Sequence, residues 1–348
     1  EITIGDWSSD VCSSDLSLRV VVSGAGGLIG YSLSGLLGDG TVFGTDYLVT
    51  LVLHDIPRSE KKLIALKAEL EDCAFEYVSD ILYYTTAREA FKDADVIFFL
   101  ASLPLTGGDR SSLLSKNISI YSDFGKALDE VAHKNCYSVV IANPANTLTY
   151  ALMASAPSIS RKNFFALNTT DHNRARSIAL RICRERYDAS LQLSDIEGIT
   201  AWGNHGGTMY ADTSRATIRG KPLRDLIADN ELWEKEYVEL VERRGWVLME
   251  LRGGVSSALS VARASVVVAR WLFQGSQGKT VTLAVCSDGN PYGVSEGLIF
   301  GMPVIVENGT WRYVEGLEIN DKLREHIVKN NEYLKSEIDL ANQTMNSL

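Results

Sequence analysis

The sequence has no apolar run long enough to cross a membrane, and it has no excess of basic residues. Its longest apolar stretch, residues 96–105, falls well short of the roughly 20 residues that a spanning helix needs, and we interpret it as a buried parallel strand. The net charge of −10 at pH 7 argues against nucleic acid or an anionic membrane as a partner. An acidic surface still permits an anionic small-molecule ligand, because a few cations in a cleft are enough to bind it.

Cysteine and histidine are scarce, and neither is clustered. The cysteines lie far apart and form no CxxC pair, so the sequence indicates neither a disulfide framework nor a zinc site. The five cysteines are Cys12, Cys73, Cys136, Cys183 and Cys286. No metal-binding spacing of histidines and carboxylates is present either, and we expect no metal. Scattered thiols are typical of a reducing compartment, so we expect the protein in the cytoplasm.

The first sixteen residues differ from the rest of the chain. Residues 1–16 are rich in serine and aspartate, contain no lysine or arginine, and begin without methionine. They show no basic segment followed by an apolar one, so they do not resemble a secretory signal. The stretch DWSSDVCSSDL is similar to the translation of a short-read sequencing adapter. We therefore expect residues 1–16 to be a non-native tail and leave them out of the fold prediction.

Strands and helices are predicted to alternate along the first half of the chain. An apolar β-branched run at residues 17–23 meets a glycine cluster, and residues 28–37 have helical spacing. The next predicted elements are strands at 48–55, 96–102 and 138–146, with an amphipathic helix over about Glu60–Glu76. This alternation is typical of an α/β fold with a doubly wound parallel sheet.

The second half has a different pattern. Helices are predicted at residues 171–187, in two stretches between 231 and 274, and at 320–343. Residues 280–289 and 303–314 are typical of antiparallel strands, which makes this half an α+β unit. The length suits about two domains, and we expect them at residues 17–165 and 166–348.

A glycine-rich turn separates the first strand from the first helix. Gly24, Gly27 and Gly30 form GxxGxxG, in which small residues allow a tight turn and a close approach of the backbone to a pyrophosphate at the helix N-terminus. Asp55 ends the next strand, where a carboxylate is placed to bind the ribose hydroxyls of NAD. It would repel a 2′-phosphate, so we expect NAD, although the nearby Arg58 leaves NADP open. The alternative interpretation of Asp55 is a turn or capping residue.

Three further segments carry polar side chains suited to catalysis: NPANT at 143–147, DHNRA at 171–175 and WGNHGG at 202–207. In this order and approximate spacing they are similar to motifs of the cytosolic-type malate dehydrogenases, within the lactate/malate dehydrogenase family. The stretches GDGTVFG, ELEDCAF, SDGNPYGV and TWRYVEGL add to the resemblance, which covers residue 18 to about residue 340. It implies a Rossmann-type NAD-binding domain followed by a catalytic domain, and a homodimer.

The predicted chemistry is the oxidation of a 2-hydroxy acid. Oxidising a secondary alcohol releases a hydride and a proton, and the imidazole of His205 can accept the proton near neutral pH. Asp171 would hold the other ring nitrogen, as the Asp–His pair of the family does. Arg174 lies about one helical turn after Asp171, and its planar fork suits a bidentate grip on a substrate carboxylate.

Further site residues follow from the resemblance. Arg110 would polarise the substrate carbonyl, and Asn143 would hydrogen-bond the substrate oxygen. Ser256 and Ser257 match a pair near the nicotinamide, and we expect Asn117 and Ser257 to contact the cofactor.

One position departs from the malate dehydrogenases. These enzymes usually carry an arginine directly after the proline of the loop at residues 103–113, where it pairs with the second carboxylate of the substrate. Here Leu105 follows Pro104, and the loop holds no other cation than Arg110. Enclosing an unpaired carboxylate costs about 2–5 kcal/mol, so Leu105 favours a methyl or alkyl group, as in lactate. The overall resemblance places malate first, with a monocarboxylate as the alternative.

Other enzyme classes fit less well. Short-chain reductases and nucleotide-sugar epimerases need a Tyr-xxx-Lys pair, which this sequence lacks. The remaining alternative is a catalytically silent homologue that binds NAD. The full set of Asp171, Arg174, His205, Arg110 and Asn143 argues against it, because a silent protein has no need of them.

Overall fold

The computed structural model describes residues 16–103, 110–226 and 230–348. At residues 110, 111, 230–232 and 234 only the backbone is described. The predicted tail therefore lies outside the described residues except for Leu16, which opens the first strand.

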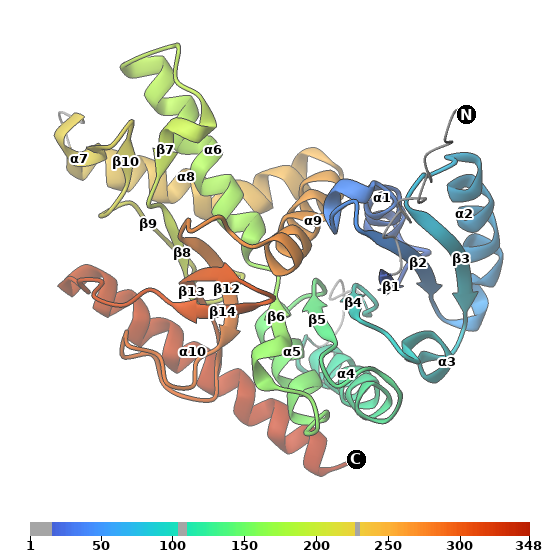
Figure 1. The fold of residues 1–348 in the computed structure, drawn as a ribbon. Helices are drawn as coiled ribbons and strands as arrows, with labels where there is room; N and C mark the ends of the chain where they lie inside the picture. Colours follow the sequence, from blue (N-terminus) through green and yellow to red (C-terminus); the bar gives the residue numbers. More distant parts are fainter. Residues whose placement is uncertain (1–15, 104–109, 227–229) are drawn as a thin grey trace, which may run out of the picture.

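A nine-stranded sheet forms the centre of the molecule, in the order β14-β13-β12-β6-β5-β4-β1-β2-β3 (Figure 1). The run from β3 to β6 is parallel and has the strand order of a dinucleotide-binding Rossmann sheet, as predicted. The antiparallel strands β12–β14 extend it beyond β6. The strands are β1 (Leu16–Ser23), β2 (Tyr47–His54), β3 (Val78–Tyr84), β4 (Val96–Phe99), β5 (Tyr137–Val140), β6 (Phe164–Ala166), β12 (Val281–Cys286), β13 (Ile299–Glu307) and β14 (Thr310–Tyr313).

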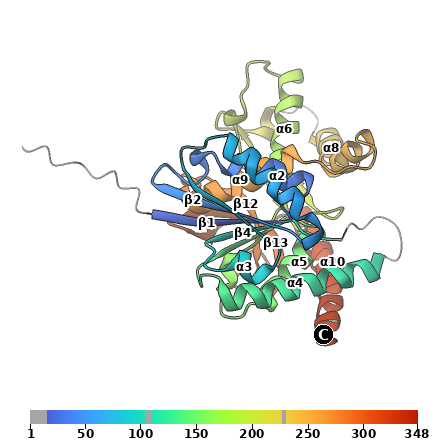
Figure 2. The same ribbon diagram turned by 90° about the vertical axis from the view of Figure 1, so that its right-hand side faces the viewer.

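Helices cover both faces of this sheet (Figure 2). Side chains alternate along a strand, so β1 sends Val20 and Val22 into one apolar cluster with α1, α2 and α9, and Val21 into another with α3, α4 and α5. This two-sided burial explains why the parallel strands are continuously apolar. The helices of the first half are α1 (Leu28–Leu37), α2 (Glu60–Asp72), α3 (Ala87–Phe91), α4 (Arg110–Val131) and α5 (Ala145–Ala154), with short 3-10 turns η1 (Gly40–Val42) and η2 (Pro57–Ser59).

The second half adds a smaller layer around two long helices. A third apolar cluster joins α6, α8 and the hairpin of β8 and β9. The helix α10 packs against α4 and α5, and so ties the end of the chain to the first half (Figure 2). These elements are η3 (Arg161–Asn163), α6 (Thr169–Arg186), η4 (Leu193–Asp195), β7 (Ile196–Glu197), β8 (Thr200–Trp202), β9 (Tyr210–Asp212), β10 (Thr217–Ile218), β11 (Lys221–Pro222), α7 (Leu223–Leu226), α8 (Asn230–Leu251), α9 (Leu259–Gln274) and α10 (Asp321–Asn346).

Two points of the predicted secondary structure need correction. The strand β3 was missed, because it lies at the sheet edge and its residues Ser79 and Asp80 are exposed, so it lacks an apolar run. The helix α2 ends at Asp72 rather than near Glu76. The antiparallel strands of the second half, as predicted in type, continue the large sheet, since Ala284 of β12 pairs with Ala166 of β6.

Among the described residues, no helix is both long enough and apolar enough to cross a membrane.

Candidate active site

A cavity of about 370 Å³ lies beyond the carboxyl ends of β5 and β6, where ligands bind in open α/β sheets. Its walls come from both halves of the chain: the start of α1, the segments after β5 and β6, the turn after β8, and helices α8 and α10. The predicted site residues that line it are Asn143, Asp171, Arg174, His205, Ser256 and Ser257. The fold thus brings together residues that are far apart in the sequence.

Residues 24–30, here called the glycine turn, connect β1 to α1 beside this cavity. Gly24 has φ of +95°, and a Cβ there would lie 2.7 Å from the backbone nitrogen of Ala101. A Cβ at Gly30 would lie 2.4 Å from the carbonyl oxygen of Gly24. Gly27 is the N-cap of α1, whose first-turn N–H groups have no partner within the helix. A bare backbone at a helix N-terminus fits the pyrophosphate of a dinucleotide.

Asp55 follows β2 and faces the glycine turn. Its Oδ2 accepts a hydrogen bond from the Gly26 N–H at 3.0 Å, and its Oδ1 accepts one from the Ile56 N–H at 2.8 Å. A Cβ at Gly26 would lie 2.9 Å from this carboxylate, so Gly26 is a further glycine that sequence reasoning missed. Both interpretations of Asp55 are compatible, because a carboxylate oxygen that holds the turn keeps lone pairs for a ribose hydroxyl.

His205 and Asp171 form a close pair. The Nδ1 of His205 lies 2.6 Å from Oδ2 of Asp171, and the Asp171 side chain is only 3% exposed. Asp171 comes from the first turn of α6, and His205 from the turn between β8 and β9. Because Nδ1 is engaged, Nε2 is the ring atom that can exchange a proton with a ligand in the cavity.

Two opposing effects set the pKa of this imidazole. Burial disfavours its charged form, but the charge and hydrogen bond of Asp171 outweigh burial and the nearby Arg174, and they raise the pKa of His205 above its usual value. A raised pKa extends the protonated form of the imidazole to higher pH, which suits a group that donates a proton to a substrate oxygen.

Arg174 shares the carboxylate of Asp171. Its Nη1 donates to Oδ1 of Asp171 at 3.0 Å, while the side chain is 14% exposed and lines the cavity. Gly245 of α8 lies against the guanidinium, since a Cβ there would be 3.7 Å from Nη2. The remaining N–H groups of this fork can bind a carboxylate in the bidentate manner.

The other predicted site residues have different outcomes. Leu105 lies outside the described residues, and of Arg110 the structure describes only the backbone, at the start of α4. Asn117 is buried and is absent from the described lining of the cavity. Its Oδ1 accepts from the Leu103 N–H at 2.7 Å and its Nδ2 donates to the Leu103 carbonyl at 3.0 Å. Asn117 thus binds the backbone of Leu103, and its contact with the cofactor stays a prediction.

His172, the neighbour of Asp171, belongs to the core. Its Nδ1 lies 3.2 Å from Oγ1 of Thr282, and its ring makes an edge contact with Trp271. Burial, with a smaller effect from Arg176, lowers the pKa of His172 to about 3. It therefore stays neutral and does not compete with His205 for the acid/base role.

Sequence reasoning missed several residues of the site. Asn146 of the NPANT segment accepts a hydrogen bond from the backbone N–H of His205 at 2.9 Å and donates to the Ile299 carbonyl at 2.8 Å. Three residues of α8, Glu242, Trp246 and Met249, form one wall of the cavity. Asn146 could have been suspected from its motif, whereas the α8 residues carry no local signal.

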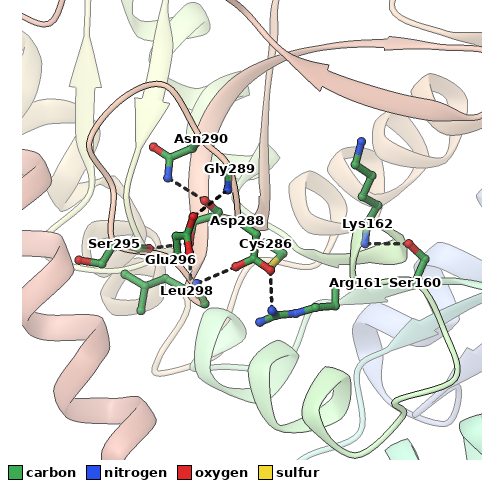
Figure 3. A network of polar contacts seen from close by, with 12 residues as sticks. Ser160, Arg161, Lys162, Cys286, Asp288, Gly289, Asn290, Ser295, Glu296 and Leu298 are labelled. Carbon is green, nitrogen blue, oxygen red and sulfur yellow. Dashed lines mark hydrogen bonds and ion pairs between the residues drawn. The ribbon is translucent and has the colours of Figure 1, made fainter.

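The loop after β12, which matches the family stretch SDGNPYGV, is held by its own polar contacts (Figure 3). Asp288 forms an ion pair with Arg161 of η3 and accepts a hydrogen bond from the Gly297 N–H at 2.9 Å. Asn290 donates to the carbonyls of Ser287 and Val294. None of these residues lines the described cavity, so these contacts hold the loop itself and connect it to η3.

Comparison with known proteins identifies the family. Residues 18–165 match the lactate/malate dehydrogenase NAD binding domain, and residues 169–345 match the lactate/malate dehydrogenase alpha/beta C-terminal domain. The chain belongs to the lactate/malate dehydrogenase family. It is accordingly an oxidoreductase that acts on CH–OH groups, and its cofactor is NAD, which the glycine turn and Asp55 fit.

Solved structures of both enzyme types are similar to this member of the family. A ligand-free variant of lactate dehydrogenase from Trichomonas vaginalis is 32% identical, with a TM-score of 0.88, covering 96% of this chain and 99% of that chain. The same lactate dehydrogenase in complex with NADH and oxamate is 32% identical, with a TM-score of 0.87, covering 95% and 100%. Malate dehydrogenase from Naegleria fowleri is 30% identical, with a TM-score of 0.87, covering 94% and 98%.

The part of the chain that the structure describes holds no group of three or more His, Cys, Asp or Glu side chains arranged to bind a metal ion.

Proposed function

We propose that this protein is an NAD-dependent 2-hydroxy acid dehydrogenase in which His205 is the acid/base and Arg174 binds the substrate carboxylate. The observation that carries the proposal is the Asp171 carboxylate, which contacts both the Nδ1 of His205 and the Nη1 of Arg174. It fixes a proton donor and a carboxylate anchor relative to each other in one cavity.

Each residue of the proposed site has a separate role in the reaction. NAD supplies the hydride acceptor when it is bound. Arg174 orients the substrate through its carboxylate, and Asn143 hydrogen-bonds the reacting oxygen. In the oxidation of the alcohol, Nε2 of neutral His205 accepts the hydroxyl proton, and Asp171 stabilises the resulting imidazolium. In the reverse direction the imidazolium returns that proton to the carbonyl oxygen.

We further propose that the preferred substrates carry a single carboxylate. Among the described residues that line the cavity, Arg174 is the only arginine or lysine, whereas Asp171, Glu242 and Glu337 are acidic. Burial raises the pKa of Glu242, and Lys329 offsets this only in part. A second substrate carboxylate would find no second arginine or lysine among these described residues, which disfavours it by several kcal/mol, on the order of 100-fold or more in affinity.

Malate remains the second candidate. It is favoured by the resemblance of the sequence motifs and by the similarity to the Naegleria fowleri malate dehydrogenase. The monocarboxylate and malate proposals are distinguished by comparing kcat/KM for pyruvate with kcat/KM for oxaloacetate.

A panel of 2-oxo acids, followed by NADH consumption, tests both proposals. We expect turnover of pyruvate and larger 2-oxo monocarboxylates, and a kcat/KM for oxaloacetate that is lower by about 100-fold. Leu105→Arg should narrow this gap, and Glu242→Gln should narrow it less. Preference for oxaloacetate in the unmodified chain would contradict the monocarboxylate proposal, and no turnover of any 2-oxo acid would favour the silent homologue.

Two properties of the whole protein are also proposed. A homodimer, which the family resemblance implies, is supported by exposed apolar side chains at Trp246, Val247, Leu251, Val255 and Leu259. Light scattering after size exclusion tests the homodimer, with Leu251→Glu expected to weaken it.

A cytoplasmic location is supported by the four described cysteines, which are all free. Fractionation of the source cells tests that location.

A further inference from the structure

Residues 203–209, here called the histidine turn, connect β8 to β9 and carry His205. The turn contacts three other elements. Asp171 of α6 binds the imidazole, Asn146 of α5 accepts from the His205 N–H, and Asn330 of α10 accepts from the N–H of Asn204, the preceding residue, at 3.1 Å. Two consecutive peptide N–H groups at the catalytic histidine are therefore bound by side chains from distant helices.

Asn330 has a hydrogen-bonding environment that only an amide satisfies. Its side chain is fully buried. The Oδ1 lies 2.8 Å from the hydroxyl of Thr208 besides accepting from Asn204, and the Nδ2 donates to the carbonyls of Thr208 and His326 at 2.7 and 2.8 Å. Both lone-pair positions and both protons of the amide are used. An aspartate would lack the two donors, and a leucine would lack all four groups.

The backbone is shaped to let Asn330 approach. Gly203 has φ of +93°, and a Cβ on it would lie 2.3 Å from Oδ1 of Asn330. The same glycine exchanges two backbone hydrogen bonds with Gly301 of β13. The first residue of the histidine turn is therefore fixed to the large sheet, and the amide of Asn330 fits directly against it.

We propose that Asn330 is a positioning residue for His205, acting through the peptide bonds on either side of the histidine turn rather than by contact with substrate. Neither Asn330 nor Thr208 belongs to the described lining of the cavity, whereas Asn204, His205, Gly206, Gly207 and Met209 do. The C-terminal helix thus sets the distance between the imidazole and the reacting oxygen. This inference rests on the proposed role of His205.

Asn330→Leu is the primary test. Because a displacement of about 1 Å can cost about 100-fold in rate, we expect kcat for 2-oxo acid reduction to fall by roughly 30- to 100-fold, with the Kd for NADH unchanged. The rate is expressed per NADH-binding site, so that loss of folded protein does not count. Asn331→Leu is the matched control, because its side chain is also buried but contacts the Ser295 N–H at 3.3 Å, away from the histidine turn.

Thr208 supplies a milder pair of variants that keeps the inference testable if Asn330→Leu does not fold. Its hydroxyl lies 2.8 Å from Oδ1 of both Asn330 and Asn204. Thr208→Val removes this hydroxyl at equal size and should lower kcat about tenfold, while Thr208→Ser keeps it and should restore most of the rate.

A pH profile separates positioning from a general loss of stability. The charged groups around His205 are Asp171 and Arg174 on α6, with Glu242 of α8 and Glu337 of α10 in the same cavity. If the turn moves, the bond from His205 to Asp171 lengthens, and the alkaline limb of kcat/KM for reduction shifts to lower pH. Asn331→Leu should lower the Tm without moving this limb.

The outcomes distinguish this inference from the proposed function. If His205→Asn keeps full activity, the role of His205 fails, and positioning by Asn330 fails with it. If His205→Asn is inactive but Asn330→Leu and Thr208→Val turn over at the unmodified rate, only the positioning role is overturned. Equal losses of kcat in Asn330→Leu and Asn331→Leu, or in Thr208→Val and Thr208→Ser, would also overturn it.

Discussion

The glycine turn and the histidine turn border the same cavity but are built in opposite ways. The glycine turn is fixed mainly by backbone contacts, such as the Gly27 N–H to the Gly24 carbonyl and the Gly24 N–H to the His54 carbonyl, with Asp55 as a side-chain acceptor, and it depends on the absence of side chains at its glycines. The histidine turn is fixed by side chains that are 59 and 126 residues away in the sequence, Asn146 and Asn330. The glycine turn lacks side chains, which leaves room for a ligand. The histidine turn is bound by side chains of distant helices, which hold the proton donor His205 in place.

The difference predicts how each turn fails. An added methyl group in the glycine turn should weaken NADH binding while leaving the turnover of bound substrate unchanged. Loss of a distant amide should damage the histidine turn while leaving NADH binding intact. Binding of NADH and turnover are therefore expected to respond to separate sets of substitutions.

The largest effect is expected at the centre of the histidine site. Asp171→Asn removes the charge that raises the pKa of His205, so burial and Arg174 should bring this pKa below its usual value. We expect kcat for reduction to fall by about 10²- to 10⁴-fold at neutral pH, because the imidazole is no longer protonated. The alkaline limb of kcat/KM against pH should move to lower pH.

The control for this variant is Asp188→Asn, which disrupts an exposed ion pair with Arg219 and should leave the profile in place. A limb that stays at its original pH in Asp171→Asn would contradict the assignment of His205 as the proton donor.

The next largest effect is expected in the glycine turn. Gly30→Ala places a Cβ 2.4 Å from the Gly24 carbonyl oxygen and 2.6 Å from Cα of Ala25, both of them backbone atoms. We expect the Kd for NADH to rise about tenfold or more and the free energy of unfolding to fall by about 1–3 kcal/mol. Fluorescence titration and urea unfolding measure the two. Gly27→Ala, whose Cβ would lie 3.4 Å from the nearest atom, should lower the free energy of unfolding much less.

A smaller effect on rate is expected from Asn146→Leu, which removes the acceptor for the His205 N–H. Steady-state kinetics should show kcat lowered by roughly tenfold and the KM for NADH little changed. Thr149→Val in the same helix is the control, since its hydroxyl donates to the Ala145 carbonyl within α5 and not to His205. If both variants lose the same rate, the effect belongs to α5 as a whole and not to His205.

The smallest effect should be a gain. Gly35 lies in α1 with no atom within 4 Å of its hypothetical Cβ, in contrast to Gly30 of the same helix. Gly35→Ala should raise the free energy of unfolding by about 0.5–1 kcal/mol through helix propensity, without changing NADH binding. Destabilisation in urea unfolding would contradict this prediction.

The sequence-based predictions succeeded where the signal is local. The strands β1, β2, β4 and β5 have continuous apolar runs because both their faces are buried, and the glycine turn carries its own spacing. The set of Asp171, Arg174 and His205 was predicted from the order of the motifs, and all three side chains line one cavity. The strand β3 was not predicted, because it lies at the sheet edge and contains exposed polar residues instead of a continuous apolar run.

Long-range features could not be predicted in this way. Nothing near Asn330 distinguishes it from its neighbour Asn331, and only the folded chain shows which of the two meets the histidine turn. The pairing of β12 with β6 depends on a crossover between halves that the sequence suggested were separate. The position of Glu242 in the wall of the cavity likewise could not be predicted, because it depends on the packing of α8 beside α6.

The continuity of the large sheet has a mechanical consequence. Strand β6 pairs with β5 on one side and β12 on the other, and one apolar cluster runs from β1 and α1 through β12 and β13 to α10. No flexible connector separates the half that holds the dinucleotide from the half that holds the imidazole. We therefore expect the spacing of the two ligand-binding surfaces to be set by one shared sheet and one shared apolar core.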